Sequence, residues 1–207
     1  MMNFNYKFNS RFIWYGPFNT KFYVDNNVYI PRSPIADHLQ ELIKDKKTIL
    51  DLCCGSGALG IISALLEDKC LVDMSDINSK ALKVANKNIN NQKLNNRITC
   101  IKSDLFKNIT KKYDLIIAVP PQISKEEYNN YKESSPEPKI AYIADNDGFY
   151  FIKKILDKAH LYLNKNGILI METGIRLSEK VKKNYNNLNI EWYKFNGKDC
   201  ILKYVHQ

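Results

Sequence analysis

Residues 48–57 read Thr-Ile-Leu-Asp-Leu-Cys-Cys-Gly-Ser-Gly, and this stretch decides the fold. Its first five residues are mostly apolar, which predicts a buried strand that ends at Leu52. Gly55 and Gly57 predict a tight turn, because glycine adopts backbone conformations that other residues avoid. The apolar spacing of residues 58–67 then predicts a helix. Such a strand–turn–helix unit is typical of open α/β sheets, where ligands lie beyond the carboxyl ends of the strands.

Strands and helices alternate along the rest of the chain. The predicted strands are 48–52, 70–74, 98–102, 113–119 and 168–172, and the predicted helices are 35–44, 58–67, 79–92, 148–163 and 177–185. Apolar strands that alternate with helices predict a mostly parallel, Rossmann-like sheet covered on both faces. Two last strands near 189–195 and 200–206, joined by Asn196-Gly197, predict an antiparallel carboxyl-terminal edge. The aromatic, β-prone residues 11–30 predict a short amino-terminal hairpin.

The composition limits the classes of protein. The chain has 207 residues, 44% of them hydrophobic, which suffices for one α/β domain with a sizeable core. No apolar run approaches the roughly 20 residues of a membrane span, and no signal-peptide pattern opens the chain, so we expect a cytoplasmic protein. Five irregularly spaced cysteines argue against a disulfide framework, and no ligand spacing predicts a metal. The net charge of +9 comes from scattered lysines, with four arginines, which argues against nucleic acid as the substrate.

Acids follow three successive strands of the predicted sheet. Asp51 would repel a pyrophosphate but can accept from an ammonium, while the N–H groups at the start of the following helix can face a carboxylate. Asp76 can accept hydrogen bonds from both hydroxyls of a ribose, and Asp73 is the alternative residue for this role. Asp104 can accept from an adenine amino group, or it can serve as a helix N-cap. Together these groups predict a site for S-adenosylmethionine (SAM), although a plain strand–helix turn is the alternative. The predicted cofactor residues are Asp51, Cys53, Gly55, Ser56, Gly57, Asp76, Ile77, Asp104, Leu105 and Val119.

From about Arg11 to its end, the chain resembles the class I SAM-dependent methyltransferases, within them the HemK/PrmC-like branch that methylates glutamine side chains of release factors. The stretches that carry the resemblance are residues 11–18, 28–34, 49–57, 76–82, 147–150, 169–174 and 196–199. The resemblance implies a Rossmann-like class I methyltransferase sheet, SAM as the cofactor and transfer of a methyl group.

The chain departs from this branch at its catalytic signature. The family has Asn-Pro-Pro-Tyr after the fourth strand, where this chain has Val119-Pro120-Pro121-Gln122. The family's Asn oxygen and first Pro carbonyl accept the two N–H bonds of a planar nitrogen and aim its lone pair at the methyl carbon. Val119 has no acceptor, whereas Gln122 can form hydrogen bonds and the Pro120 carbonyl stays available. We therefore name Val119, Pro120 and Gln122 as the candidate catalytic residues.

Two further departures are the amino-terminal segment, with only about 30 residues before the first core helix, and Ile35-Ala36, where the family usually has Thr-Glu. Together with the altered signature, they point away from release factors as the substrate. The leading hypothesis is N- or S-methylation of a small, amino-acid-like molecule. The alternatives are N-methylation of a protein glutamine or a nucleobase, cyclisation of SAM with release of methylthioadenosine, and a silent SAM-binding subunit of a partner.

The candidate substrate residues are Trp14, Tyr15, Arg32 and Gln122. Arg32 can meet a substrate carboxylate or form a structural ion pair. Residues 1–34 are expected to form a β-rich cover over the substrate, residues 35–207 the SAM-binding domain, and residues 124–147 either a lid or a solvated excursion. The oligomeric state stays open.

Overall fold

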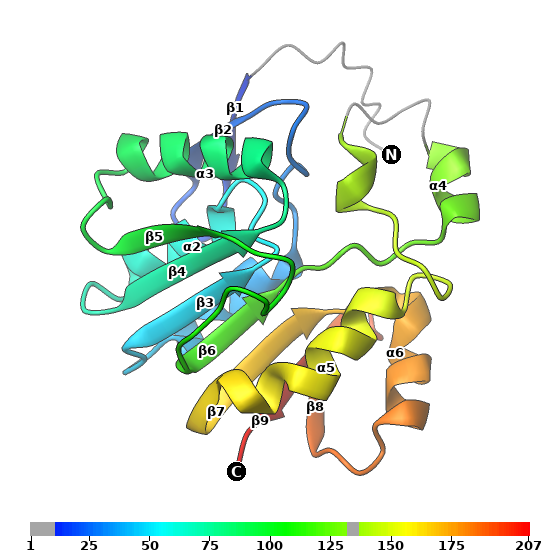
Figure 1. The fold of residues 1–207 in the computed structure, drawn as a ribbon. Helices are drawn as coiled ribbons and strands as arrows, with labels where there is room; N and C mark the ends of the chain where they lie inside the picture. Colours follow the sequence, from blue (N-terminus) through cyan, green and yellow to red (C-terminus); the bar gives the residue numbers. More distant parts are fainter. Residues whose placement is uncertain (1–10, 132–136) are drawn as a thin grey trace.

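A computed structural model describes residues 11–131 and 137–207. Its main element is a seven-stranded sheet in the order β5-β4-β3-β6-β7-β9-β8 (Figure 1). The strands are β3 Thr48–Leu52, β4 Leu71–Asp76, β5 Ile98–Lys102, β6 Tyr113–Ala118, β7 Leu163–Glu172, β8 Ile190–Phe195 and β9 Lys198–Val205. The five strands from β5 to β7 are parallel, whereas β9 is antiparallel to both β7 and β8. The predicted fold class, a mostly parallel α/β sheet with an antiparallel carboxyl-terminal edge, is confirmed.

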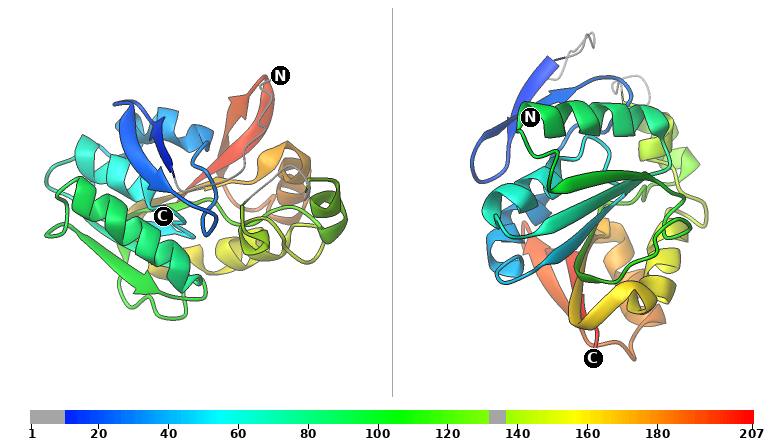
Figure 2. Two further views of the ribbon diagram at one scale, coloured as in Figure 1. Left: turned by 90° about the horizontal axis from the view of Figure 1, so that it is seen from above. Right: turned by 60° about the vertical axis from the view of Figure 1, so that its left-hand side comes forward.

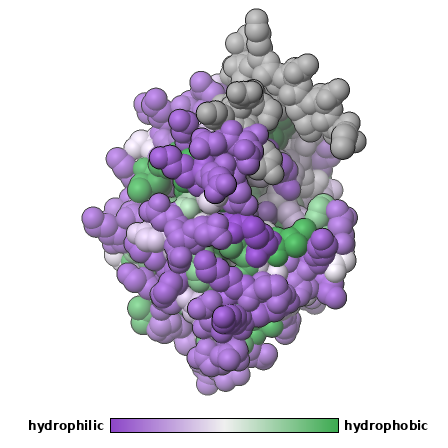
Figure 3. All heavy atoms as spheres, turned by 90° about the vertical axis from the view of Figure 1, so that its right-hand side faces the viewer, coloured by the Kyte–Doolittle hydropathy of each residue, from purple (hydrophilic) through white to green (hydrophobic). Residues whose placement is uncertain are grey.

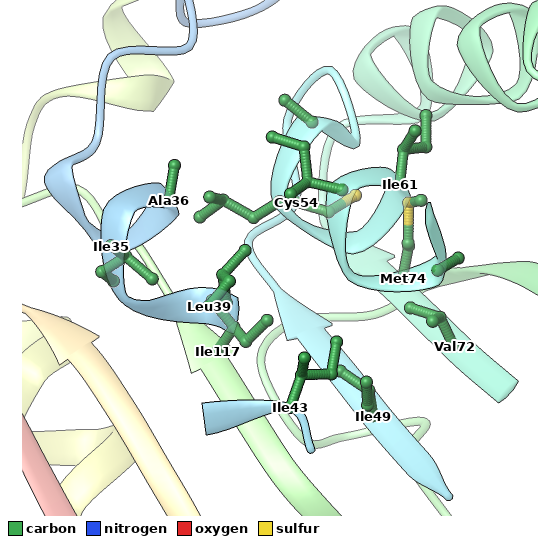
Figure 4. Packing of buried hydrophobic residues seen from close by; sticks show 14 of the residues in the cluster. Ile35, Ala36, Leu39, Ile43, Ile49, Cys54, Ile61, Val72, Met74 and Ile117 are labelled. Atoms are coloured by element: carbon green, nitrogen blue, oxygen red, sulfur yellow. The ribbon is translucent and has the colours of Figure 1, made fainter. Parts of the chain in front are cut away.

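Helices cover both faces of the sheet because the central strands bury alternate side chains on opposite faces. Ile49 lies in one buried cluster and Leu50 in the other, as do Leu115 and Ile116 of β6. The first face carries η1 Pro34–His38, α1 Leu39–Leu42, α2 Ala58–Leu66 and α3 Ser79–Asn91. The second carries α5 Tyr150–Tyr162 and α6 Gly174–Asn184. Figure 4 shows Leu39 beside Ile117, and Ile43 beside Ile49, in the first cluster.

The predicted amino-terminal hairpin is present and lies against α3 (Figure 2). It consists of β1 Arg11–Tyr15 and β2 Thr20–Val24. Asn88 of α3, fully buried, accepts from the Tyr23 N–H at 2.7 Å and donates to the Tyr23 carbonyl at 3.0 Å. The same amide donates to the carbonyl of Ser56 at 2.9 Å. One side chain therefore fixes the hairpin to both α3 and the glycine-rich loop.

Some element boundaries differ from the predictions. The predicted helix 35–44 is a 3-10 helix followed by one α-helical turn, with Pro34 at its start and the Ser33 side chain accepting from the Ile35 N–H. Strand β7 begins at Leu163 rather than near 168, because Leu163 pairs with Tyr113 of β6 before the polar residues that interrupt the apolar pattern. Two short helices, α4 Lys125–Tyr131 and η2 Lys139–Ala141, occupy the segment after β6.

The surface on the side of α4 and α6 is mainly hydrophilic, with hydrophobic residues in small separate groups (Figure 3). Among residues 11–131 and 137–207, no helix combines the length and the apolar character that crossing a membrane requires.

Candidate active site

A cavity of about 450 Å³ lies where the carboxyl ends of the parallel strands meet. Nine of the ten predicted cofactor residues line it, namely Asp51, Cys53, Gly55, Ser56, Asp76, Ile77, Asp104, Leu105 and Val119. Gly57, the tenth, is not among the lining residues. The topology thus gathers residues that lie far apart in the chain around one space.

The glycine-rich loop between β3 and α2 shows why Gly55 and Gly57 differ. Both have a positive φ, 54° at Gly55 and 78° at Gly57. A Cβ at Gly55 would meet no atom within 4 Å, so the backbone there faces open space. A Cβ at Gly57 would lie 2.9 Å from the Met74 sulfur. Gly57 is therefore required because the loop packs closely on β4 at this position. Gly55 leaves its backbone accessible from the cavity.

Asp76 ties this loop to the end of β4. Its Oδ2 accepts from the Gly55 N–H at 2.9 Å, and its Oδ1 accepts from the Asn78 N–H at 2.8 Å. Burial raises the pKa of Asp76 above its ordinary value, although these backbone bonds oppose the shift. Its rival Asp73 is bound instead to Lys111 and Tyr113 and is not among the cavity-lining residues. The structure therefore places Asp76, not Asp73, at the cavity.

Asp51 is the most deeply buried acid of the cavity, with 2% of its surface exposed. Its Oδ2 accepts from the Gly60 N–H at 2.9 Å, and no basic side chain pairs with it among the described residues. Burial raises the pKa of Asp51 to about 7. A buried carboxylate without a cation partner is suited to receive an ammonium group.

The neighbouring thiols have no nucleophilic role in this setting. Burial first, and then the nearby carboxylates, raise the pKa of both Cys53 and Cys54 well above the ordinary value. A thiol needs its thiolate form to react, so both side chains stay inert at neutral pH.

The loop after β5 forms another wall. Asp104 is exposed at the edge of the cavity, and Leu105, with φ 48°, lies beside it. Ser103 is buried and donates from its hydroxyl to the Leu105 carbonyl at 2.6 Å. This bond stabilises the turn that presents Asp104 and Leu105 to the cavity.

Residues 119–122 follow β6 and line the cavity. Val119 packs against the first buried cluster and offers no polar side-chain atom to the cavity. The Gln122 N–H donates to the Tyr142 carbonyl at 3.1 Å, and its Nε2 is 3.4 Å from Glu172 Oε1. Gln122 Oε1 is buried and has no hydrogen-bond partner among the described residues. A buried amide oxygen without a donor is uncommon in folded proteins, and this one belongs to a residue that lines the cavity.

Glu172, at the end of β7, does not line the cavity itself but bonds to Ser33 and Gln122, which do, and the sequence reasoning missed it. Its Oε2 accepts from the Ser33 hydroxyl at 2.5 Å, and burial raises its pKa. Tyr15 donates to the Ser33 carbonyl, so the hairpin, the segment before η1 and β7 meet here. The signal available was the acid at a strand end within the stretch 169–174, where other strand ends already carried site residues.

Of the predicted substrate residues Trp14 and Arg32, the first lies outside the cavity lining and the second lines the cavity within an ion pair. Trp14 is 58% exposed on the hairpin and is not among the cavity-lining residues, because its position in β1 alternates with that of Tyr15, which does line the cavity. Arg32 lines the cavity, but it forms the structural ion pair rather than standing free for a substrate carboxylate. Its two terminal nitrogens lie 2.9 and 3.0 Å from the oxygens of Glu137.

The Arg32–Glu137 pair joins the amino-terminal segment to the segment after α4. Glu137 is buried, and its carboxylate also accepts from Tyr142 and from the Ile30 N–H. Burial opposes its ionisation, but the hydrogen bonds from Arg32 and Tyr142 keep the pKa of Glu137 below its ordinary value. Ile140 and Tyr142 of the same segment line the cavity. Residues 137–142 thus cover one side of the site.

The sheet order, the glycine-rich loop with Asp51 and the acid after the next strand define the class of protein as the class I SAM-dependent methyltransferases. The comparisons with known proteins agree. The family described as methyltransferase small domain matches residues 33–133. The ribosomal protein uL3 glutamine methyltransferase of Francisella tularensis subsp. tularensis is 39% identical over 163 residues, which cover 74% of this chain and 52% of that protein. The protein of the same name from Bordetella pertussis is 35% identical, covering 74% of this chain and 55% of that protein.

The chain therefore belongs to the class I SAM-dependent methyltransferases of the HemK/PrmC-like branch, as its motifs predicted. Among solved structures, the 16S rRNA methyltransferase RsmC of T. thermophilus, in complex with AdoMet and guanosine, superimposes with a TM-score of 0.66. It is 14% identical and covers 96% of this chain and 51% of that one, so this similarity concerns the fold. The chain spans about half the length of the curated relatives it matches.

The relatives correct one expectation. A small, amino-acid-like molecule as the substrate is wrong, because both relatives are named as glutamine methyltransferases of a ribosomal protein. The missing acceptor at Val119 favoured the small molecule over the protein glutamine, which was kept as an alternative. The relatives support that alternative.

Proposed function

We propose that this chain transfers the methyl group of SAM to the side-chain amide nitrogen of a glutamine in a protein. The names of the two relatives support this substrate, and the cavity supports the chemistry. The observation that carries the proposal is Gln122, which lines the cavity and whose buried Oε1 has no hydrogen-bond partner among the described residues; a turn of the side chain would present this oxygen to the substrate. An amide nitrogen brings two N–H donors that need acceptors, and this oxygen is an acceptor in need of a donor.

The donor set of the cavity fits SAM. Asp51, buried without a cation partner, would hold the ammonium of its amino-acid part, and the backbone at Gly55 leaves room for the carboxylate. Asp76 would accept from the ribose hydroxyls, and Asp104 from the adenine amino group, with Ile77 and Leu105 as apolar walls. When bound, SAM would supply an electrophilic methyl group on a sulfonium and leave as S-adenosylhomocysteine, while the methylated amide nitrogen would release one proton to solvent.

The protein's task is then to position the nucleophilic nitrogen. The Pro120 carbonyl accepts one N–H of the substrate amide and Gln122 Oε1 accepts the other, which replaces the acceptor that Val119 lacks. Glu172 accepts from Gln122 Nε2 and thereby directs the carbonyl oxygen of that side chain away from itself. Holding the planar amide by both donors aims its lone pair, and such alignment accounts for most of the rate in a transfer of this kind.

The test uses the full chain with SAM and the ribosomal protein uL3 of Francisella tularensis. We expect mass spectrometry of the digested product to show one added methyl group on a glutamine. Gln122→Leu removes the acceptor at similar size, so we expect kcat/KM to fall about 5- to 150-fold, the cost of 1–3 kcal/mol for an unpaired donor. Val119→Asn in the same variant restores an acceptor and should recover part of the activity.

The controls separate this proposal from its alternatives. Calorimetry should show unchanged SAM affinity for Gln122→Leu, because the side chain lies outside the predicted cofactor contacts. Release of methylthioadenosine from SAM alone, without a methylated protein, would favour cyclisation. SAM binding with no transfer to uL3 in any variant would favour a silent subunit. Either result would overturn the proposed function.

A further inference from the structure

The hairpin and helix α3 present a second feature outside the cavity, on the outer surface. One face of the hairpin and the exposed side of α3 form a continuous group of aromatic rings and lysines, called here the aromatic–lysine face. It consists of Phe12, Trp14, Lys21, Tyr23, Lys80, Lys83 and Lys87. Figure 2 shows the two elements side by side.

The strand pairing explains why the rings lie on one side. Phe12 pairs with Tyr23 and Trp14 with Lys21, so these four side chains share the face of the hairpin opposite to the buried Phe22 and Val24. Phe12 is 44% exposed and Trp14 58%. The ammonium of Lys21 lies 4.3 Å from the Phe12 ring centroid and 5.8 Å from that of Trp14. Rings and positive charges are therefore interleaved.

The helix extends the positive charge. Lys80, Lys83 and Lys87 are exposed on one side of α3 and span about 10 Å at 1.5 Å per residue. Helix α3 contains no acidic residue, and none of these lysines forms an ion pair with a described residue. Asp25 is the single acid among the residues that line the shallow depression with these lysines. Three lysines thus share the depression with one acid.

This face adjoins the candidate active site. Asn27 lines both the shallow depression and the main cavity, and its carbonyl accepts from Asn78 beside Asp76. Asn88 fixes the hairpin to α3 and to the Ser56 carbonyl of the cofactor loop. A molecule held on the aromatic–lysine face would therefore lie next to the mouth of the cavity.

We propose that the aromatic–lysine face binds single-stranded RNA. Lysines neutralise phosphates, and exposed rings stack on unpaired bases, whereas the bases of a duplex are already stacked inside it. The choice of RNA over DNA rests on the proposed function, because the relatives are named for a ribosomal protein, and ribosomal proteins bind RNA. The substrate class is then a protein bound to RNA, with the RNA held beside the site of methylation.

The test measures fluorescence anisotropy of a labelled twelve-nucleotide RNA of mixed sequence with the full chain. We expect Lys80→Gln/Lys83→Gln/Lys87→Gln to raise Kd at least tenfold and to flatten the slope of log K against log salt by about 2. Trp14→Ala should raise Kd at least fivefold, and Trp14→Phe, which keeps a ring, should recover most of the loss. The matched control, Lys158→Gln/Lys165→Gln/Lys183→Gln, removes the same charge elsewhere and should change Kd less than twofold.

Several outcomes would overturn the inference. An equal loss in the control triple variant would show binding through net charge alone. Tighter binding to DNA of the same sequence, to poly-glutamate or to phosphatidylserine vesicles would identify another partner. Methylation of isolated uL3 by the same variants distinguishes the two proposals. Methylation without RNA binding would refute only the inference about RNA. RNA binding without methylation would refute only the proposed function.

Discussion

Asp51→Asn exchanges a buried, unpaired carboxylate for a neutral amide of the same shape. The side-chain oxygen of Asn still accepts from the Gly60 N–H, as Asp51 does at 2.9 Å. The variant therefore removes the charge that burial disfavours and keeps the local hydrogen bond. It also removes the anion that we assign to the ammonium of SAM, so the folded protein should gain stability while it loses affinity for the cofactor.

The size of the effect follows from the pKa of Asp51. Burial raises it from 3.8 to about 7, which corresponds to about 4 kcal/mol at 1.4 kcal/mol per factor of ten. Because the folded value is the higher one, the protein loses stability as the pH rises from about 4, where the unfolded chain ionises, to about 7, where the folded chain ionises too. Relative to wild type, Asp51→Asn should gain about 1 kcal/mol at pH 4.5 and about 4 kcal/mol at pH 8.

Urea unfolding without cofactor at both pH values, followed by circular dichroism, measures this difference. Calorimetry at pH 8 should show at least a tenfold loss of SAM affinity. Asp73→Asn is the matched control, because Asp73 accepts from Lys111 Nζ at 3.0 Å and the Tyr113 hydroxyl at 2.8 Å, so we expect it to lower stability by about 1–3 kcal/mol. If Asp51→Asn were less stable than wild type at pH 8, or bound SAM equally well, the reasoning about Asp51 would be refuted.

Three further variants test how the site is supported. Gly57→Ala places a Cβ 2.9 Å from the Met74 sulfur at a φ of 78°. We therefore expect the free energy of unfolding in urea to fall by about 2 kcal/mol. An unchanged urea midpoint would contradict the packing role of Gly57. Asn88→Ala leaves two backbone groups of β2 unpaired and should lower the free energy of unfolding by about 3 kcal/mol. The hairpin amides should then exchange hydrogen faster, and amides that stay protected would argue against the role of Asn88 in fixing the hairpin. Arg32→Met leaves buried Glu137 without its cation and should lower the free energy of unfolding by about 1–3 kcal/mol. The loss is smaller than for a fully buried pair because the Arg32 side chain is 45% exposed. If the same loss of stability persists when Glu137→Gln is added, the ion pair is not its cause.

The strand–turn–helix unit at 48–66 illustrates what a local pattern predicts well. Apolar runs, two glycines and an acid at a strand end sufficed to predict β3, the loop and α2, and the structure has a cavity at the sheet edge where the ligand site was predicted. The boundary of β7 was predicted less well, because the pairing of Leu163 with Tyr113 joins residues 50 positions apart and leaves no local pattern. Trp14 and Tyr15 show the same limit, since the sequence marks both as aromatic and only the register decides which faces the cavity.

Short segments of the chain were enough to predict the fold class, the family and the acids that follow successive strands, because hydrophobic period, glycine and strand ends are local properties. Which polar groups are already paired depends on the tertiary structure. Arg32 is bound to Glu137, 105 residues away, while Gln122 Oε1 has no hydrogen-bond partner among the described residues. The physical reason is that a side chain's free hydrogen-bonding capacity depends on neighbours brought together by the fold. That capacity, at Asp51 and Gln122, is what the proposed chemistry uses.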